Sequence, residues 1–263
     1  MRNYAFIDGE FLNKLVEKVS EEFNVEISKS GGSTEFTLYE SKLCNASERV
    51  FYYDAYPESA QDSPEFHRKE AEFRRISAQK GCFVRPALTR RGRRREQKGV
   101  DVLLAVECLQ HALRGNIDGA QIFTSDMDFF PLLEALQNSK TRTALYYDPD
   151  RTNPDLISVA DVSIPLSSAN IIMGSNLTPG YSQSSFDIKE HLRRGSDVRP
   201  IPLPENASSA VEMFEIEDNH GDLRYCLVDK YDRCIYANYR CTLESLARQQ
   251  LPLSDEFLLR NPF

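Results

Sequence analysis

Short apolar runs typical of buried strands alternate with stretches of helical periodicity over residues 4–166, and this alternation limits the fold more than any other feature. The apolar runs predict six strands, at residues 4–8, 48–56, 82–88, 119–125, 141–148 and 162–166. The stretches between them predict helices, at residues 10–23, 62–79, 99–115, 131–139 and 153–161. Strands separated by helices imply βαβ units. We therefore expect an α/β fold of three layers, α/β/α, with a mostly parallel central sheet covered by helices on both faces.

The length of 263 residues suits one large α/β domain, or a medium domain followed by a small one. We expect the α/β domain to span residues 1–173. Residues 174–205 are rich in Ser, Pro and Gly and predict a linker. Residues 206–263 have the pattern of antiparallel strands followed by a helix, which predicts a small C-terminal α+β module. The apolar strands of that module leave three roles open: packing, homodimer formation and substrate selection.

Composition excludes several classes of protein. No run of about 18 apolar residues occurs, so the sequence predicts no membrane span. The first apolar stretch is short and is broken by Asp8, which is unlike a signal peptide, and we expect a cytoplasmic protein. The six cysteines lack the CxxC spacing of a zinc ribbon, and we expect them to be free and mostly buried. The net charge of −8 argues against a general nucleic-acid coat protein.

Carboxylates stand where two of the expected strands end. Asp8 closes the first strand, and Asp126 and Asp128 follow the fourth. Ligands of open parallel sheets bind at the carboxyl ends of the strands, near the point where strand order reverses. These acids therefore converge if the first and fourth strands are neighbours. Two ionised carboxylates about 4 Å apart repel by roughly 4 kcal/mol at an effective dielectric constant near 20, so a cation, a proton or wide exposure must relieve the Asp126 and Asp128 pair.

A fourth acid, Asp101, lies in the first turn of the helix expected at residues 99–115. Three of the four acids have an ordinary structural explanation: Asp101 could complement the helix dipole, Asp128 could cap the helix that begins at Pro131, and Asp8 could be a turn residue. A shared divalent cation explains the set better, because carboxylate oxygens are ligands of Mg²⁺ and Mn²⁺. These segments contain no His or Cys that would favour zinc. Such ions stabilise the charge that develops during phosphoryl transfer.

The segment TRRGRRREQK, residues 89–98, concentrates five arginines and one lysine in a net acidic chain. It is either a solvated loop or a phosphate-binding rim beside the acids, because guanidinium groups suit phosphate contacts. The candidate substrate-binding residues in or near this segment are Arg91, Arg93, Arg94, Arg95 and Lys98.

Four stretches resemble a known family when taken together and in order. They are FIDGEFL, KGVDVLLAVECLQHALRG, IFTSDMDFFPLLEAL and VADVSIPL. They resemble the NYN domain, a group of PIN-like nucleases, over roughly residues 3–170. The resemblance implies a PIN-like, Rossmann-like α/β/α fold and Mg²⁺- or Mn²⁺-dependent cleavage of RNA. It implies metal-binding and catalytic roles for Asp8, Asp101, Asp126 and Asp128, and it places Ser125 and Lys98 near that centre.

The chain departs from the family pattern at two positions. Glu10 stands where the first motif usually has Asn, and Met127 stands where Gly is common. Glu10 adds an acid that could help to hold metal or could repel substrate. Asp161 matches a late acid of the family whose role the resemblance leaves open. Glu107 matches an acid of the helix that also carries Asp101, and we expect a structural or interface role for it.

The leading hypothesis is a metal-dependent endoribonuclease that hydrolyses phosphodiester bonds of single-stranded RNA. One alternative is an RNA-binding regulatory module with weak or no catalytic activity. Another is a phosphotransferase or nuclease that acts on DNA through the DxD pair of Asp126 and Asp128.

Overall fold

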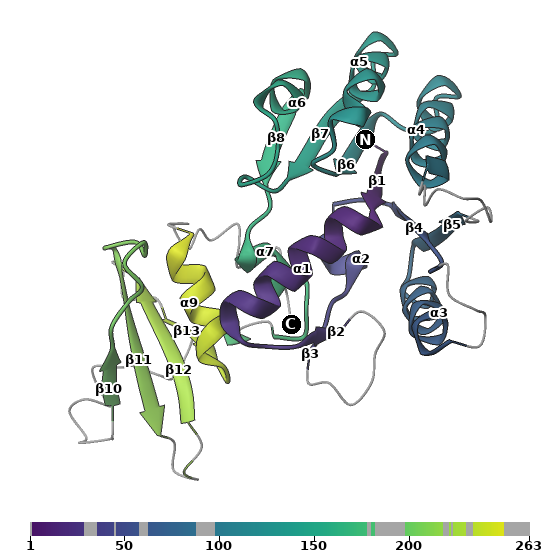
Figure 1. The fold of residues 1–263 in the computed structure, drawn as a ribbon. Coiled ribbons are helices and arrows are strands. Elements are labelled where there is room, and N and C mark those ends of the chain that lie inside the picture. The colour runs from purple at the N-terminus through teal and green to yellow at the C-terminus, as the bar shows by residue number, and fades with distance from the viewer. Residues whose placement is uncertain are drawn as a thin grey trace. The chain divides into compact units, whose positions relative to one another are not determined.

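The computed structural model describes residues 2–28, 36–44, 46–57, 63–87, 98–177, 180–181, 198–217, 221, 223–229 and 234–249. The chain divides into two compact units, Met1–Ser175 and Asn176–Phe263 (Figure 1).

Six parallel strands form the central sheet of the first unit, in the order β5-β4-β1-β6-β7-β8. The strands are β1 (Asn3–Asp8), β4 (Arg49–Ala55), β5 (Cys82–Ala87), β6 (Gly119–Phe123), β7 (Arg142–Tyr147) and β8 (Val162–Pro165). The chain adds strands on one side of β1 up to β5, and then crosses to the other side and continues from β6. Strand order therefore reverses between β1 and β6, and the expected parallel α/β fold is confirmed.

Helices cover both faces of this sheet (Figure 1). They are α1 (Gly9–Phe23), α3 (Pro64–Ser77), α4 (Lys98–Leu113), α5 (Phe130–Asn138), α6 (Pro154–Val159) and α7 (Ser168–Met173), with a short 3₁₀ turn, η1 (Met127–Phe129). One core joins Phe6 of β1 and Ile122 of β6 to Leu104 of α4 and Leu133 of α5. Ile7 points to the opposite face, because side chains alternate along a strand, and it is also fully buried.

Three small elements lie between α1 and β4, where the sequence predicts no structure. Strands β2 (Ile27–Ser28) and β3 (Phe36–Thr37) pair in parallel, and α2 (Glu40–Leu43) follows them. The carboxylate of Glu40 is fully buried and is bound by Arg75 of α3 at 2.8 Å. Elements of two to four residues are too short to show a period, so only this tertiary pairing defines them.

The second unit contains an antiparallel sheet in the order β10-β11-β12-β13-β9. Its strands are β9 (Gly180–Tyr181), β10 (Val198–Ile201), β11 (Val211–Glu217), β12 (Leu223–Asp229) and β13 (Cys234–Ala237). Helix α9 (Arg240–Arg248) packs on β12 and β13 and buries Leu243 and Leu246. The unit therefore has the expected α+β character, and its strands β9 and β10 lie within the range that the sequence suggests is a linker.

The helices and cysteines of the described residues bear on two predictions from composition. None of the helices among them is both long and apolar enough to cross a membrane. The cysteines described as free include four that are buried, Cys44, Cys82, Cys108 and Cys226.

Candidate active site

The site lies at the carboxyl edge of the sheet, where β1 and β6 are neighbours. The two strands pair in parallel, with Ile7 opposite Phe123. The residues that follow each strand, Asp8 at the end of β1 and Thr124 to Asp126 after β6, therefore emerge side by side. The condition for convergence of the acids, that the first and fourth major strands are neighbours, is therefore met, and the pairing occurs at the switch point of strand order.

Asp8 joins the end of β1 to the start of α1. Its Oδ1 caps the helix by accepting hydrogen bonds from the amides of Glu10 at 3.0 Å and Phe11 at 3.3 Å. Gly9 lets the start of α1 lie close to Asp54, because a Cβ atom at this position would lie 2.6 Å from Oδ2 of Asp54. Burial raises the pKa of the Asp8 carboxyl from 3.8 to about 6, against the opposing effect of the hydrogen bond from the Phe11 amide.

The buried hydroxyl of Thr124 connects Asp8 with Asp126. Oγ1 of Thr124 donates to Oδ2 of Asp8 at 3.1 Å and accepts from the amide of Asp126 at 3.2 Å. The Asp8 carboxylate and the Asp126 amide therefore lie close together, because both bind the same hydroxyl oxygen. Sequence reasoning did not single out Thr124, although its place between a buried strand and an acid pair was a usable signal.

The two acids of the DxD pair are both exposed. Oδ1 of Asp126 caps η1 by accepting from the amide of Asp128 at 2.9 Å. Asp126 lines a pocket at this edge of the sheet, whereas Asp128 is not one of the residues that line it. Of the three ways to relieve the repulsion between them, wide exposure is the one that the protein itself provides.

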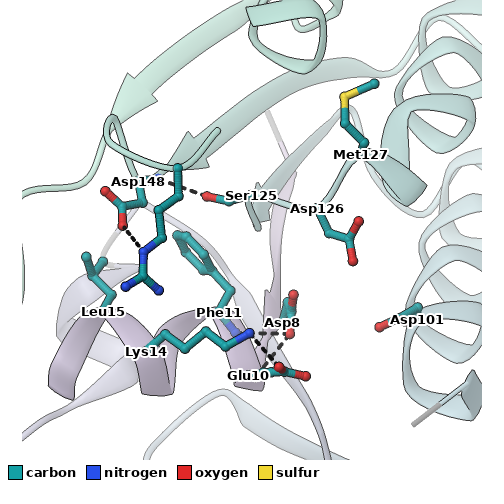
Figure 2. A pocket seen from close by; sticks show the side chains of 11 residues that line it. Asp8, Glu10, Phe11, Lys14, Leu15, Asp101, Ser125, Asp126, Met127 and Asp148 are labelled. Atoms are coloured by element: carbon teal, nitrogen blue, oxygen red, sulfur yellow. Dashed lines mark hydrogen bonds and ion pairs between the residues drawn. The ribbon is translucent and has the colours of Figure 1, made fainter. Parts of the chain in front are cut away.

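Asp101 approaches the same pocket from α4. Its pKa is raised, first by burial and then by repulsion from Asp126, Glu10 and Asp128. Figure 2 shows the side chains of Asp101, Asp8 and Asp126 turned toward a common space from three different elements. Because carboxylates so far apart in the sequence influence one another's ionisation, the four predicted acids share one electrostatic environment.

A pocket of about 330 Å³ connects these side chains. Its acidic part is formed by Asp8, Glu10, Asp101 and Asp126. Its lining also includes three polar residues that sequence reasoning missed, namely Lys14, Asp148 and Arg151. The signal for Lys14 was its place one helical turn after Glu10, whereas the two others lie in the loop after β7 and reach the pocket only because β7 pairs with β6.

Ser125 lines the pocket, but its hydroxyl is engaged by the loop after β7. Its Oγ accepts a hydrogen bond from the amide of Asp148 at 3.1 Å and lies 2.6 Å from Oγ1 of Thr152. In Figure 2 it points toward Asp148, away from Asp8 and Asp101. In the described contacts, Ser125 therefore braces the site, and its predicted contact with substrate remains a prediction.

Two other acids lie outside the pocket lining. Oδ2 of Asp161 accepts hydrogen bonds from the amide and the hydroxyl of Thr143, at 2.7 and 2.9 Å, at the edge where β7 and β8 begin. This edge is opposite to the one that carries Asp8. Glu107 accepts from the hydroxyl of Tyr53 at 2.8 Å and pairs with Arg85 at 3.0 Å, which is the structural role expected for it.

The remaining predicted residues lie outside the described part of the site. Residues 88–97, with Arg91, Arg93, Arg94 and Arg95, are not among the described residues, and the side chain of Lys98 is not described either. Their predicted contacts with substrate stay predictions.

The acidic part of the pocket suits a hard divalent cation. Among the described residues, no three His, Cys, Asp or Glu side chains are grouped tightly enough to form a complete metal site. Mg²⁺ needs less than that, because it usually keeps several waters and binds one or two carboxylates together with substrate phosphates. The available donors are all carboxylate oxygens. A cation would also offset the burial and mutual repulsion that raise the pKa of Asp8 and Asp101.

Comparison with known proteins supplies a family. The model of the NYN domain matches residues 6–167. The crystal structure of a protein of unknown function from Vibrio parahaemolyticus is similar with a TM-score of 0.43 and 16% sequence identity, over 63% of this chain and 92% of that one. The curated proteins contain no significant match.

Proposed function

The chain belongs to the NYN domain family, a family of PIN-like nucleases, and we propose that it is a Mg²⁺- or Mn²⁺-dependent endoribonuclease that hydrolyses single-stranded RNA. The observation that carries the proposal is the Thr124 bridge, which holds Asp8 beside Asp126 in a pocket that Asp101 also lines. Three carboxylates, from β1, α4 and the segment after β6, thus line one pocket at the edge where this fold class binds ligands.

The charge of the pocket supports dependence on a cation. A phosphodiester entering among Asp8, Asp101 and Asp126 would meet like charges in a partly buried site, and such repulsion is costly. The residues that would hold the ion are these three carboxylates, with Glu10 able to add a fourth. When bound, a divalent cation stabilises charge on the phosphoryl oxygens and makes a water molecule a stronger nucleophile.

The protein's own groups would orient the reaction. Oδ1 of Asp8 is fixed by two backbone amides and Oδ2 by Thr124, so this carboxylate needs little reorganisation when ligands bind. Asp126 is exposed at the start of η1, where it can exchange water for a ligand. Asp128, close enough to raise the pKa of Asp101 but outside the pocket lining, would act through the electrostatic field.

The test is cleavage of a labelled single-stranded RNA in Mg²⁺ or Mn²⁺ by the wild type, Asp126→Asn and Glu134→Gln. Glu134 is an exposed acid on α5 and serves as the control for removal of one negative charge. We expect Asp126→Asn to lose most of the activity and Glu134→Gln to retain it. Equal cleavage by all three proteins would reject the assignment of Asp126. Matched DNA and duplex RNA in the same assay define the substrate class.

Two observations favour a second candidate, an RNA-binding module with weak or no catalysis. Glu10 forms an ion pair with Lys14 at 2.5 Å, and among the described residues the acids do not form a complete metal site. That candidate predicts RNA binding without turnover in either metal, so the same proteins and substrates distinguish it.

A further inference from the structure

The pocket has a basic part besides its acidic one. Lys14 lies one turn after Glu10 on α1, and Arg151 lies in the loop that follows β7. Both line the pocket that Asp101 and Asp126 also line. One continuous cavity therefore presents carboxylates suited to a metal ion and cations suited to an anion.

The Arg151 guanidinium is available to a ligand. Its side chain is 57% exposed, and its ion pair with Asp148 is a long one, because Nε lies 3.9 Å from Oδ2, beyond hydrogen-bond distance. Asp148 does not depend on this contact, because its Oδ1 is bound by Lys18 at 3.1 Å and by the amide of Asp150 at 3.1 Å. Among the hydrogen bonds of the described residues, none uses the Arg151 guanidinium as a donor.

The loop that carries Arg151 is braced against the acidic part of the pocket. The Thr152 hydroxyl donates to the carbonyl of Asp148 at 2.8 Å and lies 2.6 Å from Oγ of Ser125. The amide of Arg151 also bonds to the Asp148 carbonyl, at 3.2 Å. Because Ser125 immediately precedes Asp126, these bonds fix the loop relative to the acids. A binding site on a braced loop loses less conformational entropy when it binds its ligand.

Lys14 is a weaker but suitable partner. Its ammonium pairs with Glu10, and both side chains are about half exposed, at 55% and 45%. An exposed pair of this kind contributes little stability, so an incoming phosphate can compete for the ammonium.

We propose that Arg151, with Lys14 as its helper, forms an anion subsite that holds a phosphate of the RNA backbone next to the phosphate bound among the acids. A guanidinium binds phosphate oxygens with two parallel hydrogen bonds, which fixes direction as well as position. This inference rests on the proposed function for its choice of RNA. It adds a direction, because the RNA backbone would run from the acids toward Arg151.

The test is RNA binding, measured separately from cleavage. Fluorescence anisotropy of a short labelled single-stranded RNA is recorded with Mg²⁺ over a range of KCl concentrations, with the full chain carrying Asp126→Asn to suppress turnover. Arg151→Ala, Arg151→Lys, Lys14→Ala and Arg142→Ala are compared in this background. Arg142 is exposed at the start of β7, on the opposite edge of the sheet, and is the matched control. Unchanged thermal unfolding shows that each variant is folded.

We expect Arg151→Ala to weaken binding about tenfold and to reduce the slope of log K against log salt by roughly 0.7, the value for one phosphate contact on a single strand. Arg151→Lys keeps the charge but loses the two parallel hydrogen bonds of the guanidinium, and its affinity for RNA should lie between those of the parent and Arg151→Ala. Lys14→Ala should have a smaller effect, and Arg142→Ala none.

The outcomes separate this inference from the nuclease proposal. If the wild type cleaves RNA and Arg151→Ala binds as Arg142→Ala does, with the same salt slope, the subsite is wrong and the nuclease stands. If the wild type cleaves no RNA but Arg151→Ala still loses affinity and slope, the subsite stands and hydrolysis is rejected. Absence of measurable binding by the parent protein also overturns the inference.

Discussion

Thr124 donates a hydrogen bond of 3.1 Å to Asp8 from the end of the neighbouring strand, and the same hydroxyl accepts the amide of Asp126. One buried oxygen thus connects the acid that ends β1 with the acid that follows β6. Since the two segments lie more than a hundred residues apart in the chain, this bond is a long-range restraint on the site. It makes the positions of the Asp8 carboxylate and of the Asp126 backbone depend on a residue that carries no charge itself.

Thr124→Val tests this restraint, because valine keeps the shape of threonine and removes the hydroxyl. The change leaves Oδ2 of Asp8 and the Asp126 amide without this partner, and should lower the free energy of unfolding by about 1–3 kcal/mol. We expect cleavage of RNA to fall at least about tenfold, since loss of about 1.4 kcal/mol in transition-state stabilisation has that effect.

Thr124→Ser is the control, since it keeps the hydroxyl and should retain most of the activity. Urea unfolding and initial cleavage rates measure the two effects. Wild-type cleavage by Thr124→Val would show that the bridge does not position the carboxylates.

The sequence was sufficient to predict the edge of the sheet at which these acids meet. Asp8 and Asp126 each end or follow an apolar run, and parallel strands carry such residues to one edge. Asp101 could be placed because the sequence predicts a helix from residue 99 with Asp101 in its first turn, and α4 begins at Lys98. Both predictions use local patterns and one rule of topology, so they require no knowledge of tertiary contacts.

Other parts of the site depend on contacts that no local pattern encodes. Arg151 and Asp148 reach the pocket because the loop after β7 folds back onto Ser125. Asp161, which matches a family acid by order in the sequence, lies at the opposite edge because it precedes β8 instead of following a strand. Resemblance in sequence matches Asp161 to a family acid but leaves its role open, whereas strand direction determines on which edge of the sheet a residue lies.

The raised pKa of Asp8 predicts a pH-dependent gain of stability for Asp8→Asn. The folded value of about 6 exceeds the unfolded value of 3.8, so the folded state holds the proton more tightly. The stabilising effect of that proton is present below pH 3.8 and is lost as the pH rises through 6. In EDTA at pH 8, the wild type should therefore be less stable than Asp8→Asn by up to about 3 kcal/mol.

Urea unfolding at pH 8 and at pH 4 measures this difference. The gain should nearly vanish at pH 4, where Asp8 is close to neutral in the folded state and partly protonated in the unfolded state. Glu134→Gln provides the comparison for an exposed acid. A gain of the same size at both pH values would contradict a burial effect on Asp8.

Addition of a divalent cation should reverse the destabilising effect of these carboxylates. A ligand that binds only the folded state at a hundred times its Kd adds about 2.7 kcal/mol to the free energy of unfolding. We expect Mg²⁺ and Mn²⁺ to raise the Tm of the wild type at pH 8, and EDTA to abolish the increase. The increase should be smaller at pH 5, because Asp8 then retains its proton.

The matched proteins for this measurement are Asp126→Asn and Glu134→Gln. Asp126→Asn should show a reduced increase in Tm, because it removes a carboxylate of the pocket. Glu134→Gln should respond as the wild type does. An equal response by all three proteins would mean that the ion binds elsewhere.

Asp161 offers a test that separates position in the fold from resemblance in sequence. Its carboxylate binds the amide and the hydroxyl of Thr143, at the edge opposite to Asp8. Asp161→Ala should therefore lower the free energy of unfolding by about 1 kcal/mol or somewhat more. Because neither residue lines the pocket, kcat and KM for RNA should stay near the wild-type values at a temperature where the variant is folded. Urea unfolding and steady-state kinetics give the two readouts. Loss of kcat without loss of stability would instead assign Asp161 a part in catalysis, and would require strand β8 to contribute to the site in a way that its present contacts do not provide.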